Sequence, residues 1–174
     1  MTLEQEQSLV IQAQAGDREA MGQLWDELSP KLFGYLVNVL HDSSLAEDVF
    51  QSTWLHAIEA LPHFKVRGIR VSAWVFAIAR NECRQLWRKT NRVVELQEGV
   101  EAITDGRHSL HTKLFIEKVL EGLSPDDQEL VRLRYIADLS IKDIAHILNI
   151  NLIAVRVRMS RAISRARTIA TKNL

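Results

Sequence analysis

The scarcity of helix breakers constrains this chain more than any other feature. Only 3 prolines and 7 glycines occur in 174 residues. Between them, apolar residues recur every three or four positions, as in an amphipathic helix, and no segment shows the alternation typical of a strand. We therefore predict an all-α fold. A chain of this length can bury a sizeable core as one ordinary domain or two small ones.

Residues that favour helix ends mark the expected elements. Helices are predicted over residues 3–15, 18–40, 45–61, 73–89, 110–122, 125–137, 141–149 and 152–171. The expected N-caps are Asp17, Ser44, Ser72, Ser124, Ser140 and Asn151. Ser44 followed by Glu47 has the pattern of a capping box. Asn149 is expected to end its helix in the left-handed conformation, which asparagine tolerates well.

Charge alternates along the chain although it sums to zero. Residues 1–66 carry 10 acids and 3 bases, whereas residues 67–92 carry 1 acid and 7 bases. Residues 93–130 carry 9 acids and 3 bases, and residues 131–174 carry 2 acids and 9 bases. This order predicts two modules that each end in a surface able to meet a polyanion, although solvated helix faces would give the same counts. The acidic, non-periodic stretch between the modules is predicted to be a flexible linker.

The last basic block has the pattern of a DNA-binding helix. Val155, Met159, Ala162, Ala166 and Ile169 fall on one apolar stripe. Arginines occupy both margins of that stripe, with Arg158, Arg161 and Arg165 on one side and Arg156 and Arg167 on the other. Because a short helix and a tight turn precede it, the block predicts a helix-turn-helix whose second helix enters the major groove. A helical hairpin kept soluble by its arginines is the simpler alternative.

The first basic block combines charge with aromatic and amide side chains. Lys65, Arg67 and Arg70 fall in a predicted loop, and Arg80, Arg84 and Arg88 recur every four residues on the next helix. Phe64, Asn81 and Trp87 stand beside this charge, whereas Trp74, Val75 and Ile78 are expected on the buried side. A groove of this kind suits splayed single-stranded bases, which need stacking surfaces and phosphate neutralisation.

Several classes of function are disfavoured. The single cysteine, Cys83, excludes an intramolecular disulfide framework. The chain contains no CxxC, no HExxH and no glycine-rich phosphate loop, so we predict no catalytic site, no metal site and no cofactor. No secretory signal is recognisable and no apolar run approaches the roughly 20 residues that span a bilayer. We expect a cytoplasmic protein that does not insert into the membrane.

With both basic blocks in view, the chain from about Ser8 to Thr168 resembles the extracytoplasmic-function (group 4) sigma factors of bacterial RNA polymerase. SLAEDVFQSTWLHAIEAL is similar to that family's polymerase-clamp helix, and SAWVFAIARNECRQLWRK is similar to its minus-ten region. LSPDDQELVRLRYIADLSIKDIAHILNI and the arginine helix are similar to its minus-thirty-five reader. The resemblance implies a non-catalytic promoter-specificity subunit, with a four-helix sigma region 2 at residues 1–91, a linker at 92–109 and a helix-turn-helix sigma region 4 at 110–174.

The resemblance also implies partners and sites. Core RNA polymerase would be bound through the clamp helices of its largest subunit, by Glu47, Asp48 and Gln51, and through its flap. Minus-ten promoter DNA would be held by Lys65, Arg67, Arg70, Arg80, Asn81, Arg84 and Arg88. Minus-thirty-five DNA would be read by Asn151, Arg156, Arg158, Ser160, Arg161 and Arg165. A membrane-associated anti-sigma factor is expected to control the protein and could hold it at the inner membrane face.

The turn before the arginine helix departs from the family pattern. The family usually has glycine, proline and a glycine–threonine pair where this chain has Asn149, Asn151, Ile153 and Ala154, and Val157 replaces a usually polar residue that faces DNA. We therefore do not assign the family's minus-thirty-five sequence to this chain. Ile153 and Val157 could instead contact another protein. The alternatives are a stand-alone helix-turn-helix transcriptional regulator and a clamp-binding protein that no longer initiates transcription.

Overall fold

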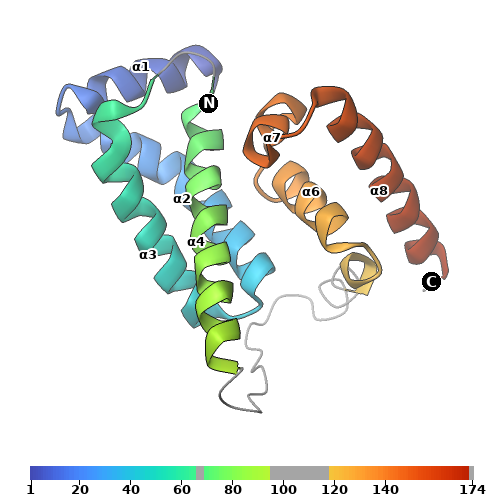
Figure 1. Ribbon diagram of the computed structural model, residues 1–174. Helices are drawn as coiled ribbons and strands as arrows, with labels where there is room; N and C mark the ends of the chain where they lie inside the picture. The colour runs from blue at the N-terminus through green and yellow to red at the C-terminus, as the bar shows by residue number, and fades with distance from the viewer. Residues whose placement is uncertain (66–68, 95–117, 173–174) are drawn as a thin grey trace. The chain divides into compact units, whose positions relative to one another are not determined.

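The computed structural model describes residues 1–65, 69–94 and 118–172, and all regular structure in these ranges is helical (Figure 1). The predicted all-α class is therefore confirmed. The chain divides into two compact units, residues 1–104 and 105–174. The limits proposed for the linker, 92 and 109, stay predictions, because residues 95–117 lie outside the described residues.

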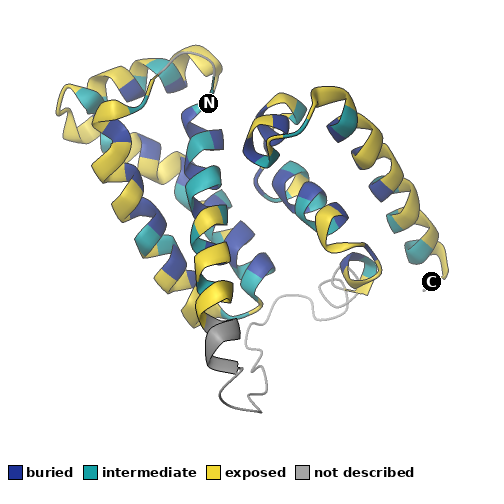
Figure 2. Ribbon diagram, viewed as in Figure 1, coloured by how far each residue is buried: buried dark blue, intermediate teal, exposed yellow. Residues whose placement is uncertain are grey.

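The first unit packs long helices around one apolar core. Its elements are α1 (Leu3–Gln14), α2 (Arg18–Leu40), α3 (Ser43–Ala60), the single 3₁₀ turn η1 (Leu61–His63) and α4 (Val71–Val94). Helix α2 contributes the centre of the core, where Leu32, Tyr35 and Leu36 are almost completely buried. The ring of Tyr35 meets Phe76 of α4 edge to face, with centroids 5.4 Å apart. Figure 2 shows buried and exposed positions alternating around the helices of this unit.

Several helix boundaries in this unit differ from the prediction, most clearly the start of α3 and the end of α4. Helix α3 begins at Ser43 because the side chain of Asp42 accepts a hydrogen bond from the Leu45 backbone N–H at 2.9 Å. The capping box predicted at Ser44 is therefore wrong, since an aspartate two residues earlier takes the cap. Helix α4 continues to Val94, beyond the predicted end at residue 89, because no glycine or proline interrupts that stretch. The last helix of the first unit thus extends through Val94.

A buried carboxylate fastens α1 to the start of α4. Glu6 is only 1% exposed, and its Oε1 accepts hydrogen bonds from the Ser72 backbone N–H at 3.0 Å and from the Ser72 hydroxyl at 3.3 Å. Its Oε2 accepts from Arg70 Nε at 2.9 Å and lies 2.7 Å from the second nitrogen of that guanidinium. Ser72 was expected to be the N-cap, but it lies inside α4 and the Glu6 side chain binds the helix start instead.

The other end of α1 fastens the segment that leads toward α4. The side-chain amide of Gln14 donates to two backbone carbonyls, that of Leu61 at 2.9 Å and that of Phe64 at 2.7 Å. These carbonyls belong to a 3₁₀ turn and the residue after it, which have few other partners for them. Helix α1 therefore holds both borders of the loop between residues 64 and 71.

The second unit is a smaller helical domain. Helical residues 118–121 precede α6 (Pro125–Tyr135), α7 (Ile141–Leu148) and α8 (Leu152–Lys172). Its core is formed by Leu130 and Leu133 from α6, Ile144 from α7, and Val155 and Ala162 from α8, all no more than 1% exposed. The predicted stripe of α8 therefore packs as expected over its first turns.

The connection between α7 and α8 follows the sequence prediction closely. Asn149 adopts the left-handed conformation, with φ 53° and ψ 47°, and its backbone N–H donates to carbonyls of the preceding turn. The side chain of Asn151 then accepts a hydrogen bond from the Ile153 N–H at 2.7 Å. Ser140 caps the start of α7 in the same way, through the Asp143 N–H at 3.2 Å. A short helix, a tight turn and a longer helix are thus in place.

Candidate nucleic-acid and protein interfaces

Helix α3 presents an acidic and amide face to solvent. Glu47, Asp48 and Gln51 are all exposed, at the spacing that puts residues on one side of a helix. The same side continues into Leu55 and Ile58, which are 57% and 48% exposed. None of these five side chains has a hydrogen bond or ion pair with another described residue. We call them the α3 face; it is a polar surface with an apolar end and is available to a partner.

Residues of the predicted minus-ten loop differ in their availability. Lys65 is exposed, whereas Arg67 lies outside the described residues. Arg70 is held by Glu6 through two of its nitrogens, and its side chain is only 33% exposed. An arginine whose fork is already occupied by a buried carboxylate fixes local geometry more readily than it contacts a new phosphate.

Helix α4 carries the rest of the first basic block. Asn81, Arg84 and Arg88 are exposed, and Arg80 is half-buried with a partner of its own. The predicted burial of this helix needs one correction, because Trp74 is only half-buried. Its ring lies against Phe64, with centroids 4.7 Å apart. The two aromatic rings therefore form a partly exposed pair at the start of α4.

The buried side of α4 is also shifted from the predicted one. Val75, Phe76, Ala79 and Cys83 are each no more than 1% exposed, whereas Ile78 is half-buried like Trp74. The cause is that α4 packs against both α2 and α3, so its buried stripe lies between those helices. The one cysteine is thus a core residue.

Helix α8 is exposed along most of its length and buried on one side (Figure 2). Asn151, Arg156, Ser160 and Arg161 are exposed, and neither arginine has a partner among the described residues. Val155, Met159 and Ala162 form the buried side. Such a helix can present unpaired guanidinium groups to a polyanion without disturbing its own core.

Two of the predicted DNA-reading arginines face acidic residues instead. Arg165 forms an ion pair with Asp127, a buried residue in the first turn of α6. Arg158 lies 3.9 Å from Asp126, but that carboxylate is 86% exposed, so the pair is weak and screened by salt. Arg165 therefore helps to hold α8 on α6, whereas Arg158 remains able to leave its partner.

Sequence reasoning missed the two carboxylates that organise these surfaces. Glu6 shares its helix face with the buried Val10, four residues on, and an acid on an apolar face is a usable signal for a buried pair. Asp127 is the third residue of a helix start, where an acid is usually explained by the helix dipole alone. Its contact with Arg165 joins residues 38 positions apart, and no local pattern reveals it.

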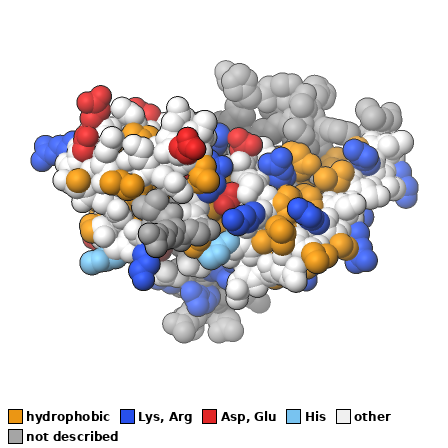
Figure 3. All heavy atoms as spheres, turned by 90° about the horizontal axis from the view of Figure 1, so that it is seen from above, with side chains coloured by type: hydrophobic (Ala, Val, Ile, Leu, Met, Phe, Trp, Pro, Cys, Tyr) orange, Lys and Arg blue, Asp and Glu red, His pale blue; other side chains and the backbone are white. Residues whose placement is uncertain are grey.

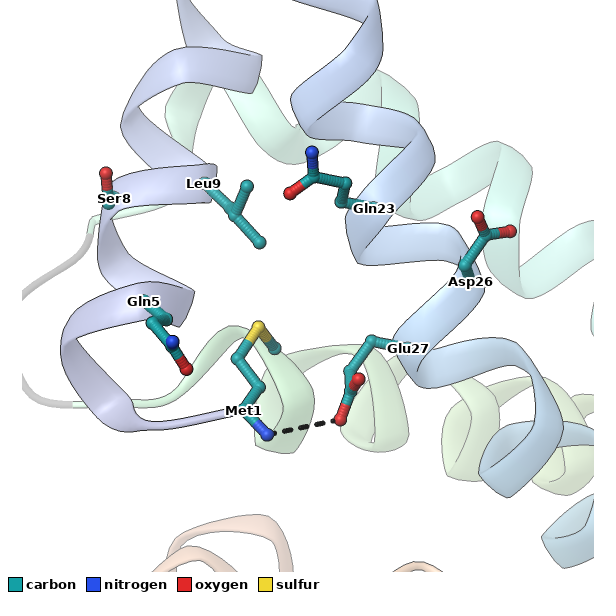
Figure 4. A pocket seen from close by; sticks show the side chains of 7 residues that line it. All are labelled: Met1, Gln5, Ser8, Leu9, Gln23, Asp26 and Glu27. Carbon is teal, nitrogen blue, oxygen red and sulfur yellow. Dashed lines mark hydrogen bonds and ion pairs between the residues drawn. The ribbon is translucent and has the colours of Figure 1, made fainter.

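A shallow hollow of about 620 Å³ lies between α1 and α2, and none of the predicted site residues lines it (Figure 4). It is lined by Met1, Gln5, Ser8, Leu9, Gln23, Asp26 and Glu27. The amino terminus crosses its rim to Glu27 Oε1 at 3.3 Å. Among the described residues, no group of three or more histidine, cysteine or acidic side chains is placed to hold a metal ion. Nor is any helix in the described part long and apolar enough to cross a membrane.

Comparison with known proteins finds a match in each unit. The family model "Sigma-70 region 2" matches residues 24–93, and "Sigma-70, region 4" matches residues 116–165. Together the two matches cover more than half of the chain.

Individual relatives align over most of this chain. The ECF RNA polymerase sigma factor BldN of Streptomyces coelicolor is 29% identical over 171 residues, which are 93% of this chain and 63% of BldN. The chain thus spans just under two thirds of that relative's length. The RNA polymerase sigma-H factor of Pseudomonas aeruginosa is 29% identical over 93% of this chain and 92% of that protein. The sigma factor RpoE of Bartonella quintana, solved in complex with the anti-sigma factor NepR, has a TM-score of 0.74 at 28% identity, over 87% of this chain and 96% of that one.

Proposed function

This chain belongs to the extracytoplasmic-function sigma factors of RNA polymerase, and we propose that its two units divide the work of promoter recognition. The first unit binds core polymerase and melted minus-ten DNA, and the second unit binds minus-thirty-five duplex. The observation that carries this proposal is the helix-turn-helix of α7 and α8, whose second helix exposes Arg156 and Arg161, two arginines with no partner in the part of the chain that the structure describes. As a sigma factor, the protein is a non-catalytic polymerase subunit.

The α3 face is the proposed contact with the clamp helices of the largest polymerase subunit. Glu47 and Asp48 complement a basic surface, and Gln51 can donate and accept hydrogen bonds at the same contact. Leu55 and Ile58 add apolar area beside the charges, which a partner must cover to gain affinity from burial. The polymerase flap is the proposed contact of the second unit.

The minus-ten surface combines Lys65 and the exposed side of α4. Arg84 and Arg88 can neutralise phosphates of a separated strand, and Asn81 can hydrogen-bond a base edge. Arg67 and Arg80 are included in the proposed surface because the family pattern places them at minus-ten DNA. Arg70 has a different role in this proposal. Its ion pair with Glu6 holds the end of the segment before α4 in place, so Arg70 positions the surface and does not itself contact DNA.

An anti-sigma factor is the proposed regulator. The RpoE sigma factor that resembles this chain was solved in complex with one, and the exposed apolar residues of the α3 face offer a surface that such a partner can cover. We place the regulated protein in the cytoplasm, where polymerase is, with a membrane-associated anti-sigma factor as the element that can retain it at the membrane face.

The test is transcription in vitro with sigma-free core polymerase on fragmented genomic DNA of the source organism, with transcript starts mapped by sequencing. We expect discrete starts that share two upstream elements about one and a half helical turns apart. The matched variants are Arg161→Ala on α8 and Arg18→Ala, an exposed arginine at the start of α2 far in sequence from either surface. Loss of starts with the first variant and not with the second supports the proposal. Absence of any start with the unmodified protein contradicts it.

A further inference from the structure

The outermost side of α8 is neutral, although the helix is strongly basic. At about 100° per residue, Ile153, Val157, Ser160 and Ser164 fall within roughly 60° of one another, opposite the buried stripe of Val155, Met159 and Ala162. We call these four residues the α8 apex. All four are exposed, and Ile153 and Val157 are 68% and 43% exposed. The two apolar residues are four positions apart, so they stand on successive turns.

Arginines flank the apex and do not occupy it. Arg156 follows on one side and Arg161 on the other, both exposed and unpaired within the described residues. Arg158 and Arg165 lie farther round, toward α6, where they face Asp126 and Asp127. In Figure 3, apolar side chains lie among basic ones on the part of the surface formed by the second unit. The charged groups are thus placed to straddle whatever the apex touches.

This arrangement fits the major groove better than a protein surface. A helix that enters the groove points its apex at base edges and its flanks at the two phosphate backbones. The 5-methyl group of thymine is the apolar feature of the groove, and it is contacted by apolar side chains. Serine hydroxyls suit either donors or acceptors on bases. A stable protein contact needs on the order of 1,000 Å² of buried surface, which two apolar side chains do not supply.

We propose that Ile153 and Val157 are specificity-determining residues that read thymine in the minus-thirty-five element by contacting its 5-methyl group, while Arg156 and Arg161 bind the flanking phosphates. The inference rests on the proposed function, because it assumes that α8 is the duplex reader. It assigns discrimination to apolar contacts, where the sequence pattern alone points to the arginines.

The experiment removes only the methyl groups. A promoter obtained from the genomic transcription assay is rebuilt with 2′-deoxyuridine in place of each thymine of its minus-thirty-five element, and with the same replacement in the spacer as a control. Initial transcription by the holoenzyme is then measured. We expect a loss of roughly fourfold for each methyl group contacted, the factor given by burial of one methyl-sized group. The spacer replacement is expected to leave transcription unchanged.

The double variant Ile153→Ser with Val157→Ser completes the test. It should transcribe the thymine promoter as weakly as the unmodified protein transcribes the deoxyuridine promoter, and it should no longer distinguish the two. Both positions are exposed, so the fold should be kept, and Ile11→Ser on α1, a residue 57% exposed, is the matched control. That control should retain full sensitivity to deoxyuridine.

Three outcomes overturn the inference. The first is equal transcription of both promoters by the unmodified protein, and the second is a double variant that still distinguishes them. The third is a double variant that loses affinity for core polymerase without a change in DNA preference, which would make the apex a protein contact. Each is distinct from failure of the proposed function, in which the unmodified protein starts no transcripts on unmodified DNA.

Discussion

Replacing Glu6 by alanine should remove the contacts that hold the start of α4 against α1, and it should impair promoter opening more than polymerase binding. The carboxylate accepts hydrogen bonds from the backbone N–H and hydroxyl of Ser72 and from the guanidinium of Arg70. All of these donors lose their partner in Glu6→Ala, and the Ser72 N–H is left buried. The loop that ends at Arg70 then loses its fixed border.

The magnitude follows from the burial of each group. Breaking a buried ion pair costs about 3–5 kcal/mol, but Arg70 keeps a side chain 33% exposed and can turn toward water, which favours the lower end. An unsatisfied buried N–H adds about 1–3 kcal/mol. Taking the lower end of both ranges, we expect Glu6→Ala to lower the free energy of unfolding of the first unit by about 4 kcal/mol. Glu6→Gln should lose about half of that, because it keeps the volume and one acceptor.

Two assays on the same proteins test this prediction. Urea unfolding gives the stability change, and permanganate reactivity of thymines at the minus-ten element reports strand opening with core polymerase present. Glu4→Ala is the matched control, since Glu4 is an exposed acid on the same helix. We expect Glu6→Ala to reduce opening at polymerase concentrations that saturate binding, with partial recovery in Glu6→Gln. A stability within about 0.5 kcal/mol of the unmodified chain, the range of ordinary surface substitutions, would refute the reasoning.

Three further predictions concern the other surfaces. Replacing Asp48 by lysine and Gln51 by alanine together should reduce affinity for core polymerase at least tenfold by placing like charges against a basic partner, measured by fluorescence anisotropy; unchanged affinity would exclude the α3 face. Arg161→Ala should lower the dependence of promoter binding on salt by about one counterion, and an unchanged salt slope would show that Arg161 contacts no phosphate. Asp127→Ala should destabilise the second unit by about 1–2 kcal/mol, because its ion pair with Arg165 is lost. Hydrogen exchange of the α8 amides measures this change, and undiminished protection would contradict the prediction.

Local chemistry explains what the sequence predicts well. Asn149, Ser140 and Asn151 act on backbone groups within a few residues of themselves, so their caps and the turn between α7 and α8 can be read directly from the chain. The apolar stripe of α8 is likewise set by periodicity alone. These features place the helix-turn-helix, and the family matches favour a polymerase subunit over a stand-alone regulator.

Contacts between distant helices explain what the sequence predicts poorly. Arg165 and Arg161 lie on the same margin of α8, yet only Arg165 meets Asp127, because it lies about 40° farther round the helix toward α6. Ser72 has the local pattern of an N-cap, but its backbone N–H is bound by Glu6, which lies 66 residues earlier in the chain. Trp74 has a large aromatic side chain, which is expected in the core, but in α4 it packs against Phe64 near the surface. Tertiary packing decides each of these cases.

Helix α1 also bears on where this protein's functional unit begins. The family model for the first unit starts at residue 24, so it omits α1 altogether. Yet the side chains of Glu6 and Gln14 are the ones that hold the two borders of the loop before α4. The recognisable family segment therefore carries the residues of the proposed minus-ten surface without the two α1 side chains that hold the borders of the segment before α4. A substitution in α1 is therefore expected to alter the geometry of the proposed minus-ten surface without replacing any residue of that surface.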